Sequence, residues 1–343
     1  MQGDFFFTQW VFLGMRWLYE HVTGQSIVLT IIISTIFIRA LTIIGDIKSR
    51  QSSMKMQAIQ PEMDKIRAKY KDNPEKMNRE SQKLMKEHGV SMFGGCLPML
   101  FTMPLFFIFI AAFRQWGNEM MVKLIVTLHE NEQAGIEMFR NFRFLWVHNM
   151  WMADSGLQPV IQSATQLFST TNNINRLLIF QEHPEYAQLF EELGFFVKDA
   201  ASKSGYALNV VQGTAASTGC ACGPTSTSVL APAAVETYNK LIQPCIDLYA
   251  GLNNGWFIFP LVCGGTTWLS SWIMTKNQQA TDTTGSTKMM QWMMPIMTFV
   301  FCMTTNASFA LYWTVSNCVS MITTILINRR FAKKTVVPED EKK

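Results

Sequence analysis

Charged residues are scarce in this sequence, and motifs for catalysis are missing from it. Asp, Glu, Lys and Arg together make up only 16% of the 343 residues. No GxxxxGK phosphate-binding loop is present, the five histidines form no HExxH pattern, and nothing indicates a nucleophile paired with a base. We therefore expect a protein that is not an enzyme, that hydrolyses no nucleotide and that needs no cofactor.

The seven cysteines do not indicate a metal site either. Four of them lie in apolar stretches, where a thiol packs as a small hydrophobic group: Cys96, Cys263, Cys302 and Cys318. Cys220, Cys222 and Cys245 lie in a more polar region, but no histidine follows them at the spacing of zinc ligands. In an oxidising compartment Cys245 could pair with one of the other two, and the sequence leaves that disulfide open.

Apolar residues, by contrast, make up 48% of the chain, although the mean hydropathy is only +0.11. Apolar and charged residues must therefore be segregated, as in a membrane protein with a sizeable part outside the bilayer. Five apolar runs are suited to cross a bilayer: 26–46, 97–113, 256–274, 289–305 and 307–327. The second and the fourth are short and contain proline. We expect an all-α polytopic membrane protein with a core of five transmembrane helices.

Lys and Arg are concentrated in three segments that fall on one side of these spans, namely 47–95, 275–288 and the tail 328–343. Because short cytoplasmic loops are enriched in basic residues, this side is predicted to be cytoplasmic. The segment 114–255 is acidic on balance and is predicted to lie outside, together with the N-terminus. The basic inner face favours anionic lipids or an acidic partner, and it needs no nucleic-acid specificity.

One charge interrupts the first apolar run. Arg39 cannot lose its proton, so it should face water or protein rather than lipid. Thr35, Arg39, Thr42 and Asp46 follow one another at helical steps and share one face. We expect this face of the helix to be in contact with water. The alternative is that Arg39 snorkels toward the basic segment that begins at Lys48.

The segment 47–95 is predicted to form a cytoplasmic helical hairpin. Its first helix carries a narrow apolar seam, which consists of Met56, Ile59, Met63, Ile66 and Tyr70. Asn73 is suited to cap the second helix, with Pro74 in its first turn and Gly89 at its end. The second helix has few apolar residues, so we expect the hairpin to be mobile and accessible to partners.

Two further segments are predicted on the extracytoplasmic side. Residues 1–25 are predicted to form an amphipathic interfacial helix, and they lack the basic start and cleavage site of a signal peptide. The segment at about 155–252, which we call the insertion, has helical patterns near both ends. Its middle part, 200–232, is rich in Gly, Ala, Ser and Thr and is predicted to be a flexible linker. We expect a small helical cap.

Several segments together resemble the YidC/Oxa/Alb family of membrane protein insertases. These are Thr35 to Arg39, Gln60 to Met63, 93–107, 144–154, and 311–317 with the basic tail that follows. The resemblance implies a hydrophilic groove that is open to the cytoplasm and to lipid, with Arg39 in its wall. An acidic tail of a client would enter this groove while the apolar segment of the client moves into lipid, without nucleotide hydrolysis.

The resemblance also implies the roles of other residues. Thr35, Tyr312 and Trp313 match positions that contact the client in the family, and Thr42 and Asn317 lie on the same polar faces as these residues. The hairpin entry at Gln60, Pro61 and Met63 matches a segment with which the family would meet its partners.

The implied partners are nascent membrane proteins, with the ribosome, the signal recognition particle receptor and the secretion channel as further ones. The protein is expected to act as a monomer in a bacterial cytoplasmic membrane.

Other interpretations compete with this one. Trp313 would also suit an interfacial aromatic belt, and Asn317 would suit a hydrogen bond between helices. The protein could be a transporter or channel subunit in which Arg39 binds an anion, although the five spans contain no internal repeat. An enzyme that acts on lipids is disfavoured, because no carboxylate or histidine lies within one helical turn of Arg39 in the span.

Overall fold

The computed structural model describes residues 6–89, 97–169, 173–202, 204–214, 226–276 and 285–332. The chain divides into two compact units. Unit 1 consists of Met1–Val28, Ile108–Ile258 and Met303–Phe309. Unit 2 consists of Leu29–Phe107, Phe259–Cys302 and Ala310–Lys343. Most described residues are helical.

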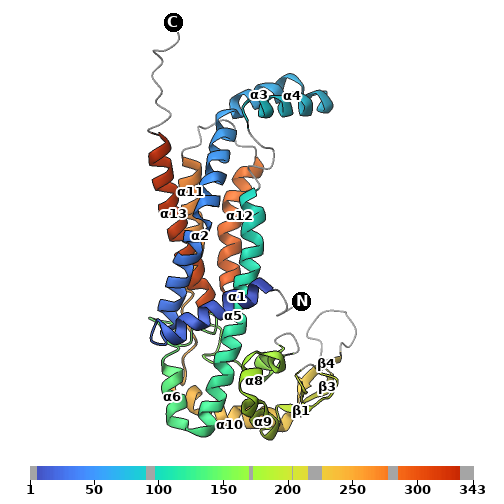
Figure 1. The fold of residues 1–343 in the computed structure, drawn as a ribbon, viewed down its shortest axis with the longest axis vertical. Helices are drawn as coiled ribbons and strands as arrows, with labels where there is room; N and C mark the ends of the chain where they lie inside the picture. The colour runs from blue at the N-terminus through green and yellow to red at the C-terminus, as the bar shows by residue number, and fades with distance from the viewer. Residues whose placement is uncertain are drawn as a thin grey trace. The chain divides into compact units, whose positions relative to one another are not determined.

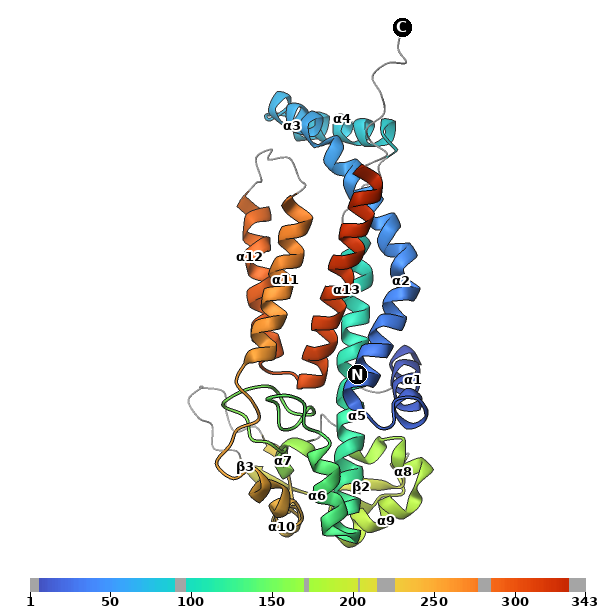
Figure 2. The same cartoon turned by 90° about the vertical axis from the view of Figure 1, so that its left-hand side faces the viewer.

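Unit 2 contains long helices that run alongside one another (Figures 1 and 2). They are most of α2 (Ile27–Ala58), the start of α5 (Leu97–Glu130), α11 (Ile258–Lys276), α12 (Gly285–Cys302) and most of α13 (Ala307–Ala332).

By length and composition, two described segments suit a membrane span, Ile27–Gly45 and Ala307–Ile327. A shorter apolar stretch, Trp292–Cys302, lies in α12. The core of five transmembrane helices stays a prediction.

The hairpin is shorter than the predicted segment 47–95, because α2 continues without a break to Ala58. The hairpin itself is formed by α3 (Gln60–Lys69) and α4 (Pro74–Glu87). Both helices have a proline in the first turn, where the missing N–H costs no hydrogen bond. Ile59 and Met63 are buried against Leu84 and Met85 of α4, so the predicted seam does pack.

The predicted ends of α4 are confirmed. The side chain of Asn73 accepts a hydrogen bond from the backbone N–H of Lys76 at 3.1 Å. Gly89 follows the helix with a φ of +60°, a conformation that glycine adopts without the steric cost of a Cβ atom. These two residues therefore fix where the second helix of the hairpin begins and ends.

We expect Asn73→Ala to destabilise α4 by about 1 kcal/mol, because one N–H of the first turn loses its acceptor. Hydrogen exchange of the α4 amides should become about fivefold faster. Asn78→Ala, at an exposed position within the same helix, is the matched control and should leave exchange nearly unchanged. Equal protection in the two variants would contradict a capping role for Asn73.

Unit 1 begins with α1 (Phe6–His21) and contains the rest of α5. Its other helices are α6 (Glu132–Arg140), α7 (Ala164–Leu167), the 3-10 helix η1 (Ile174–Arg176), α8 (Ile179–Glu182), α9 (Pro184–Glu192) and α10 (Pro232–Leu248). The predicted second span, which ends at residue 113, lies within the longer α5, whose residues from Trp116 to Val126 are largely buried in unit 1.

The insertion is not purely helical. β1 (Phe196–Lys198) pairs with β2 (Tyr206–Leu208), and β3 (Val210–Thr214) pairs with β4 (Ser226–Leu230), both in antiparallel register. The prediction of a flexible linker at 200–232 was therefore wrong for 206–214 and 226–230. Valine, threonine and tyrosine favour strands, and this outweighs the Gly and Ser content. Residues 215–225, with Cys220 and Cys222, lie outside the described residues.

An aromatic core holds the insertion together. Phe168, Phe190, Phe195 and Tyr238 are buried, and their ring centroids lie 4.8 to 6.3 Å apart. The hydroxyl of Tyr238 donates to the carbonyl oxygen of Gln162 at 2.7 Å. Cys245 on α10 is also buried, and burial raises the pKa of its thiol to about 12. The insertion thus has apolar packing of its own, as a cap would need.

Candidate functional site

The helix that carries Arg39 has two different faces. Large apolar side chains are exposed along one face of α2, namely Leu29, Ile33, Ile36, Phe37, Leu41 and Ile44. On the other face Ile31, Ser34 and Thr35 are buried, while Arg39 and Thr42 are partly buried. An exposed face of this composition suits lipid contact, so the guanidinium is turned toward protein.

Arg39 is bound to a second helix of the same unit. Its Nε donates to Oγ of Ser316 on α13 at 2.8 Å, and its Nη2 donates to the same oxygen. Ser316 is only 3% exposed. Arg39 and Ser316 lie within the two segments that suit a membrane span. A charged donor on one span is therefore held by a hydroxyl on the other.

Further polar side chains join α13 to α11. The indole Nε1 of Trp313 donates to Oγ1 of Thr267 at 3.2 Å. The amide nitrogen of Asn317 lies 3.1 Å from Oγ1 of Thr266 and 3.0 Å from Oγ1 of Thr267. We call these residues the polar set of unit 2. Its members are Arg39, Ser316, Trp313, Asn317, Thr266 and Thr267. All its members are side chains that hydrogen-bond between helices.

The predicted site residues take different places in this arrangement. Thr35 is 1% exposed and donates its hydroxyl to the backbone oxygen of Ile31 at 2.6 Å. Thr42 likewise donates to the backbone oxygen of Arg39. Tyr312 is buried one turn before Ser316. In this conformation Thr35 and Tyr312 are therefore enclosed by protein, and Arg39, Thr42, Trp313 and Asn317 remain partly accessible.

The hairpin residues also separate into two groups. Gln60 is partly exposed and Pro61 is exposed at the start of α3, whereas Met63 is buried in the seam against α4. Gln60 and Pro61 are thus accessible to a partner, and Met63 acts in packing.

Sequence reasoning missed a set of buried contacts in unit 1 that we call the Asp154 junction. Asp154 is fully buried, and its Oδ2 accepts from Nε1 of Trp146 at 2.9 Å. Its Oδ1 accepts from the backbone N–H groups of Trp256 at 2.8 Å and Phe257 at 3.2 Å, just before α11. An acidic residue in a segment of aromatic residues was a signal in the sequence, but two of these three partners, the N–H groups of Trp256 and Phe257, are about a hundred residues away.

Further hydrogen bonds join the same segments at the Asp154 junction. Oδ1 of Asn254 accepts from the backbone N–H of Asn149 at 2.7 Å, and the side-chain amide of Asn254 donates to the backbone oxygen of Asn149 at 2.9 Å. The backbone N–H groups of Ala307 and Ser308 donate to the carbonyls of Met152 and Met150, both at 2.9 Å. The first turn of α13 is thereby satisfied by the segment 144–154.

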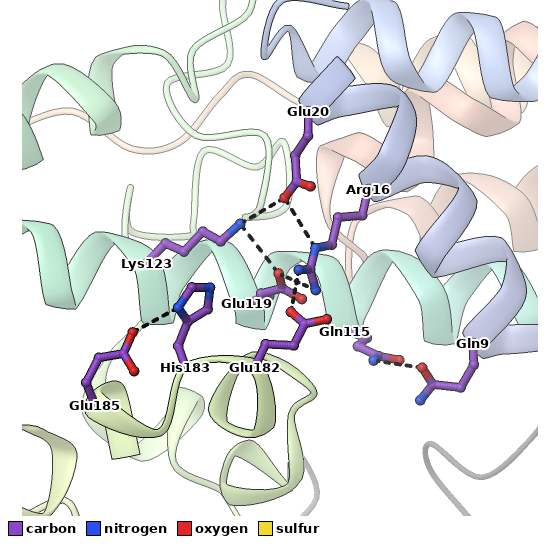
Figure 3. A network of polar contacts seen from close by, with 9 residues as sticks. All are labelled: Gln9, Arg16, Glu20, Gln115, Glu119, Lys123, Glu182, His183 and Glu185. Atoms are coloured by element: carbon purple, nitrogen blue, oxygen red, sulfur yellow. Dashed lines mark hydrogen bonds and ion pairs between the residues drawn. The ribbon is translucent and has the colours of Figure 1, made fainter. Parts of the chain in front are cut away.

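A network of charges, also missed, fastens α1 to α5 within unit 1 (Figure 3). Nη1 of Arg16 lies 3.3 Å from Oε1 of Glu119, and Nζ of Lys123 lies 3.6 Å from the same oxygen. Arg16 also pairs with Glu182 of the insertion, and Glu20 pairs with both Arg16 and Lys123. The polar face predicted for the N-terminal helix thus contacts protein, while Phe6, Trp10 and Trp17 are exposed.

The carboxylate of Glu119 is 1% exposed, and its burial raises the pKa of the group although Arg16 and Lys123 act in the opposite direction. A carboxyl group whose pKa is higher in the folded state stabilises that state at low pH. This contribution is lost as the pH rises through the folded pKa. We expect Glu119→Gln to flatten this part of the stability profile and to keep the melting temperature at neutral pH.

Thermal unfolding of the detergent-solubilised protein between about pH 4 and pH 8 tests this expectation. Glu137→Gln, on the exposed side of α6, is the control and should keep the wild-type profile. A Glu119→Gln variant that melts well below the wild type at neutral pH would mean that the ion pairs outweigh the cost of burial.

Comparison with known proteins identifies a matching family model and several relatives of this chain. A family model described as "60Kd inner membrane protein" matches residues 17–208 and 229–334. The membrane protein insertase YidC of Clostridium perfringens is 33% identical over 148 residues, which are 43% of this chain and 54% of that protein.

Two other relatives share the same printed name. The protein of an Anaeromyxobacter species is 32% identical over 149 residues, which are 43% of this chain and 23% of the relative. The protein of Aquifex aeolicus is 44% identical over 97 residues, which are 28% of this chain and 19% of the relative. The matches thus span about half of the first relative and less than a quarter of the other two.

Proposed function

The chain belongs to the family described as 60Kd inner membrane protein, and from this premise we propose that it inserts apolar segments of other proteins into a membrane. The names of its relatives support this activity. The observation that carries the mechanism is the contact between Arg39 and Ser316, which places a permanent positive charge between two apolar helices of unit 2.

In the proposed mechanism the polar set of unit 2 lines a hydrophilic groove that is reached from the cytoplasm. Arg39 attracts a carboxylate of the client, which at 4 Å and an effective dielectric constant near 20 gains about 4 kcal/mol. Ser316 holds the guanidinium in place, and Trp313 with Asn317 offers an indole face and an amide to the entering chain. The client therefore meets a polar surface within the membrane.

The energy for transfer then comes from the client itself. Its apolar segment moves into lipid and gains roughly 25 cal/mol for each Å² that leaves water. A membrane potential assists outward movement of negative charge by about 2.3 kcal/mol per charge per 100 mV. Neither contribution needs a nucleotide, so the protein lowers the barrier without supplying chemical energy.

The remaining parts take supporting roles. The basic segment around α3 and α4 is placed on the cytoplasmic side, where Gln60 and Pro61 would meet a ribosome, a targeting receptor or the secretion channel. The N-terminus is placed outside, with the exposed aromatic residues of α1 at the interface. The protein acts as a monomer in this proposal.

Depletion of the protein from its cell is the direct test. We expect small single- and double-spanning membrane proteins to lose protease protection of their translocated ends within the depletion period. Expression of a soluble exported protein with a cleavable signal is the control for general damage. Unchanged insertion together with loss of an anion flux would instead favour a transporter that uses Arg39 as its binding group.

A further inference from the structure

Two threonines on one turn of α11 bind polar groups of α13. Oγ1 of Thr267 lies 3.2 Å from Nε1 of Trp313 and 3.0 Å from the amide nitrogen of Asn317. Oγ1 of Thr266 lies 3.1 Å from the same nitrogen. All four residues belong to unit 2. A single hydroxyl, that of Thr267, therefore contacts both of the uncharged groups that the proposed mechanism offers to a client.

The hydroxyl protons of these threonines are already used within α11. Thr267 donates to the carbonyl oxygen of Cys263 at 2.8 Å, and Thr266 donates to that of Val262 at 2.8 Å. A hydroxyl has one hydrogen to donate and two lone pairs, so only the lone pairs of each oxygen are left for other partners. The two threonines therefore present acceptors to α13 and bind only groups that donate.

This arrangement fixes the orientation of the Asn317 amide. Its nitrogen carries two hydrogens, and the two threonine oxygens are the acceptors for them. If the amide were turned over, its carbonyl oxygen would face two oxygens that have no hydrogen left to donate. The carbonyl oxygen of Asn317 therefore takes no part in the contact with the threonines of α11.

The indole of Trp313 is held at two points. Its N–H donates to Thr267 of α11, and its ring meets the ring of Phe106 of α5 edge to face, with centroids 5.3 Å apart and an angle of 80° between the planes. Phe106 also belongs to unit 2. The ring contact fixes where the indole lies, and the hydrogen bond to Thr267 fixes how it is turned.

The packing of α13 on α11 does not depend on Thr267 alone. One turn earlier on α11, Sγ of Cys263 donates to the carbonyl oxygen of Ala310 at 3.2 Å, and both residues are buried. Loss of the Thr267 hydroxyl should therefore release two side chains of α13 while the helix itself stays attached.

We propose that Thr267 is a positioning residue of the client site: its hydroxyl oxygen holds the indole of Trp313 and the amide of Asn317 in the orientation in which they meet a client. Thr267 acts through these two side chains. This role rests on the function proposed above and deepens it, because it divides the site into two parts. Ser316 supports the charged contact of Arg39, and Thr267 supports the uncharged contacts.

The first part of the test is insertion of clients by Thr267→Val, measured as protease protection in cells that depend on the variant. Loss of one acceptor should reduce it about three- to tenfold. Clients with acidic and with neutral tails should be affected alike, because the indole and the amide carry no charge. Thr267→Ser keeps the oxygen and should restore most of the activity. Thr266→Val, which removes one acceptor of Asn317 and none of Trp313, should have a smaller effect.

Thr298→Val is the matched control. The hydroxyl of Thr298 on α12 also donates to a carbonyl oxygen of its own helix, that of Met294 at 2.9 Å. Among the described residues, no side chain of another helix bonds to it. Thr298→Val should therefore insert clients normally, and Thr267→Val should melt close to this control.

The second part observes the indole directly. The full chain is labelled with 5-fluorotryptophan and studied in detergent by fluorine NMR, and Trp313→Phe identifies the resonance of Trp313 by its loss. We expect Thr267→Val to shift or broaden this resonance, because the indole N–H loses its acceptor. Thr267→Ser and Thr298→Val should leave it in place. This measurement does not depend on any client.

Each other result overturns the proposal. An unmoved Trp313 resonance in Thr267→Val would show that the hydroxyl does not orient the indole, and melting well below Thr298→Val would make the role of Thr267 structural. A moved resonance with normal insertion, while Arg39→Ala inserts poorly, would remove Thr267 from the mechanism and leave the proposed function intact. Normal insertion by both Thr267→Val and Arg39→Ala would refute the proposed function itself. A loss confined to acidic tails would mean that Thr267 acts through Arg39.

Discussion

Replacement of Arg39 by alanine is expected to reduce insertion of clients with acidic translocated tails by at least about tenfold, since the loss of ~1.4 kcal/mol of attraction already has that effect. Arg39→Lys should retain much of the activity, because it keeps the charge and loses only the planar donors. The measurement is protease protection of a small client in cells that depend on the variant. A client without acidic residues in its tail should be affected much less.

Two matched variants separate the effect of the Arg39 charge from the effect of its hydrogen bond to Ser316. Ser316→Ala removes the acceptor of Arg39 but keeps the charge, so we expect an intermediate loss. Arg329→Ala changes an exposed arginine of α13 beyond the apolar segment Ala307–Ile327 and should insert clients normally. If Arg39→Ala folded and protected clients as well as Arg329→Ala does, the proposed role of the charge would be refuted.

The largest effect on stability is expected at the Asp154 junction. Asp154→Ala leaves the indole of Trp146 and the backbone N–H groups of Trp256 and Phe257 without their acceptor in a buried site. Loss of a buried carboxylate with these partners should cost about 3–5 kcal/mol. The loss is measured as a lower melting temperature and as rapid proteolysis between the segment 144–154 and α11.

A second variant, Gly255→Ala, is expected to disturb the carboxylate of Asp154 by a steric clash. A Cβ at Gly255 would lie 2.0 Å from Oδ1 of Asp154, so Gly255→Ala must displace the carboxylate. Gly265→Ala, where no atom lies within 4 Å of the new Cβ, is the control. Asp247→Ala removes an exposed carboxylate that accepts from Gln243, and we expect it to cost less than about 1 kcal/mol. Similar melting of all variants would contradict a supporting role for Asp154.

Local patterns predicted the local features well. The cap at Asn73 and the left-handed Gly89 depend on a few neighbouring residues, and both are confirmed. The family resemblance was read from short segments, and the match to the family described as 60Kd inner membrane protein confirms it. Compositional reasoning failed at 206–214 and 226–230, because strand pairing depends on which residues face each other across a hairpin.

The sequence by itself determined that Arg39 must be shielded from lipid, because the charge and the apolar run around it allow no other low-energy arrangement. It also determined that α1 would be amphipathic. Only the tertiary structure decided that Ser316 accepts the hydrogen bonds of the Arg39 guanidinium and that Glu119 pairs with Arg16. It also decided that Asp154 accepts a hydrogen bond from a residue about a hundred positions away. A buried polar group needs some partner, but helical periodicity does not specify which distant segment supplies it.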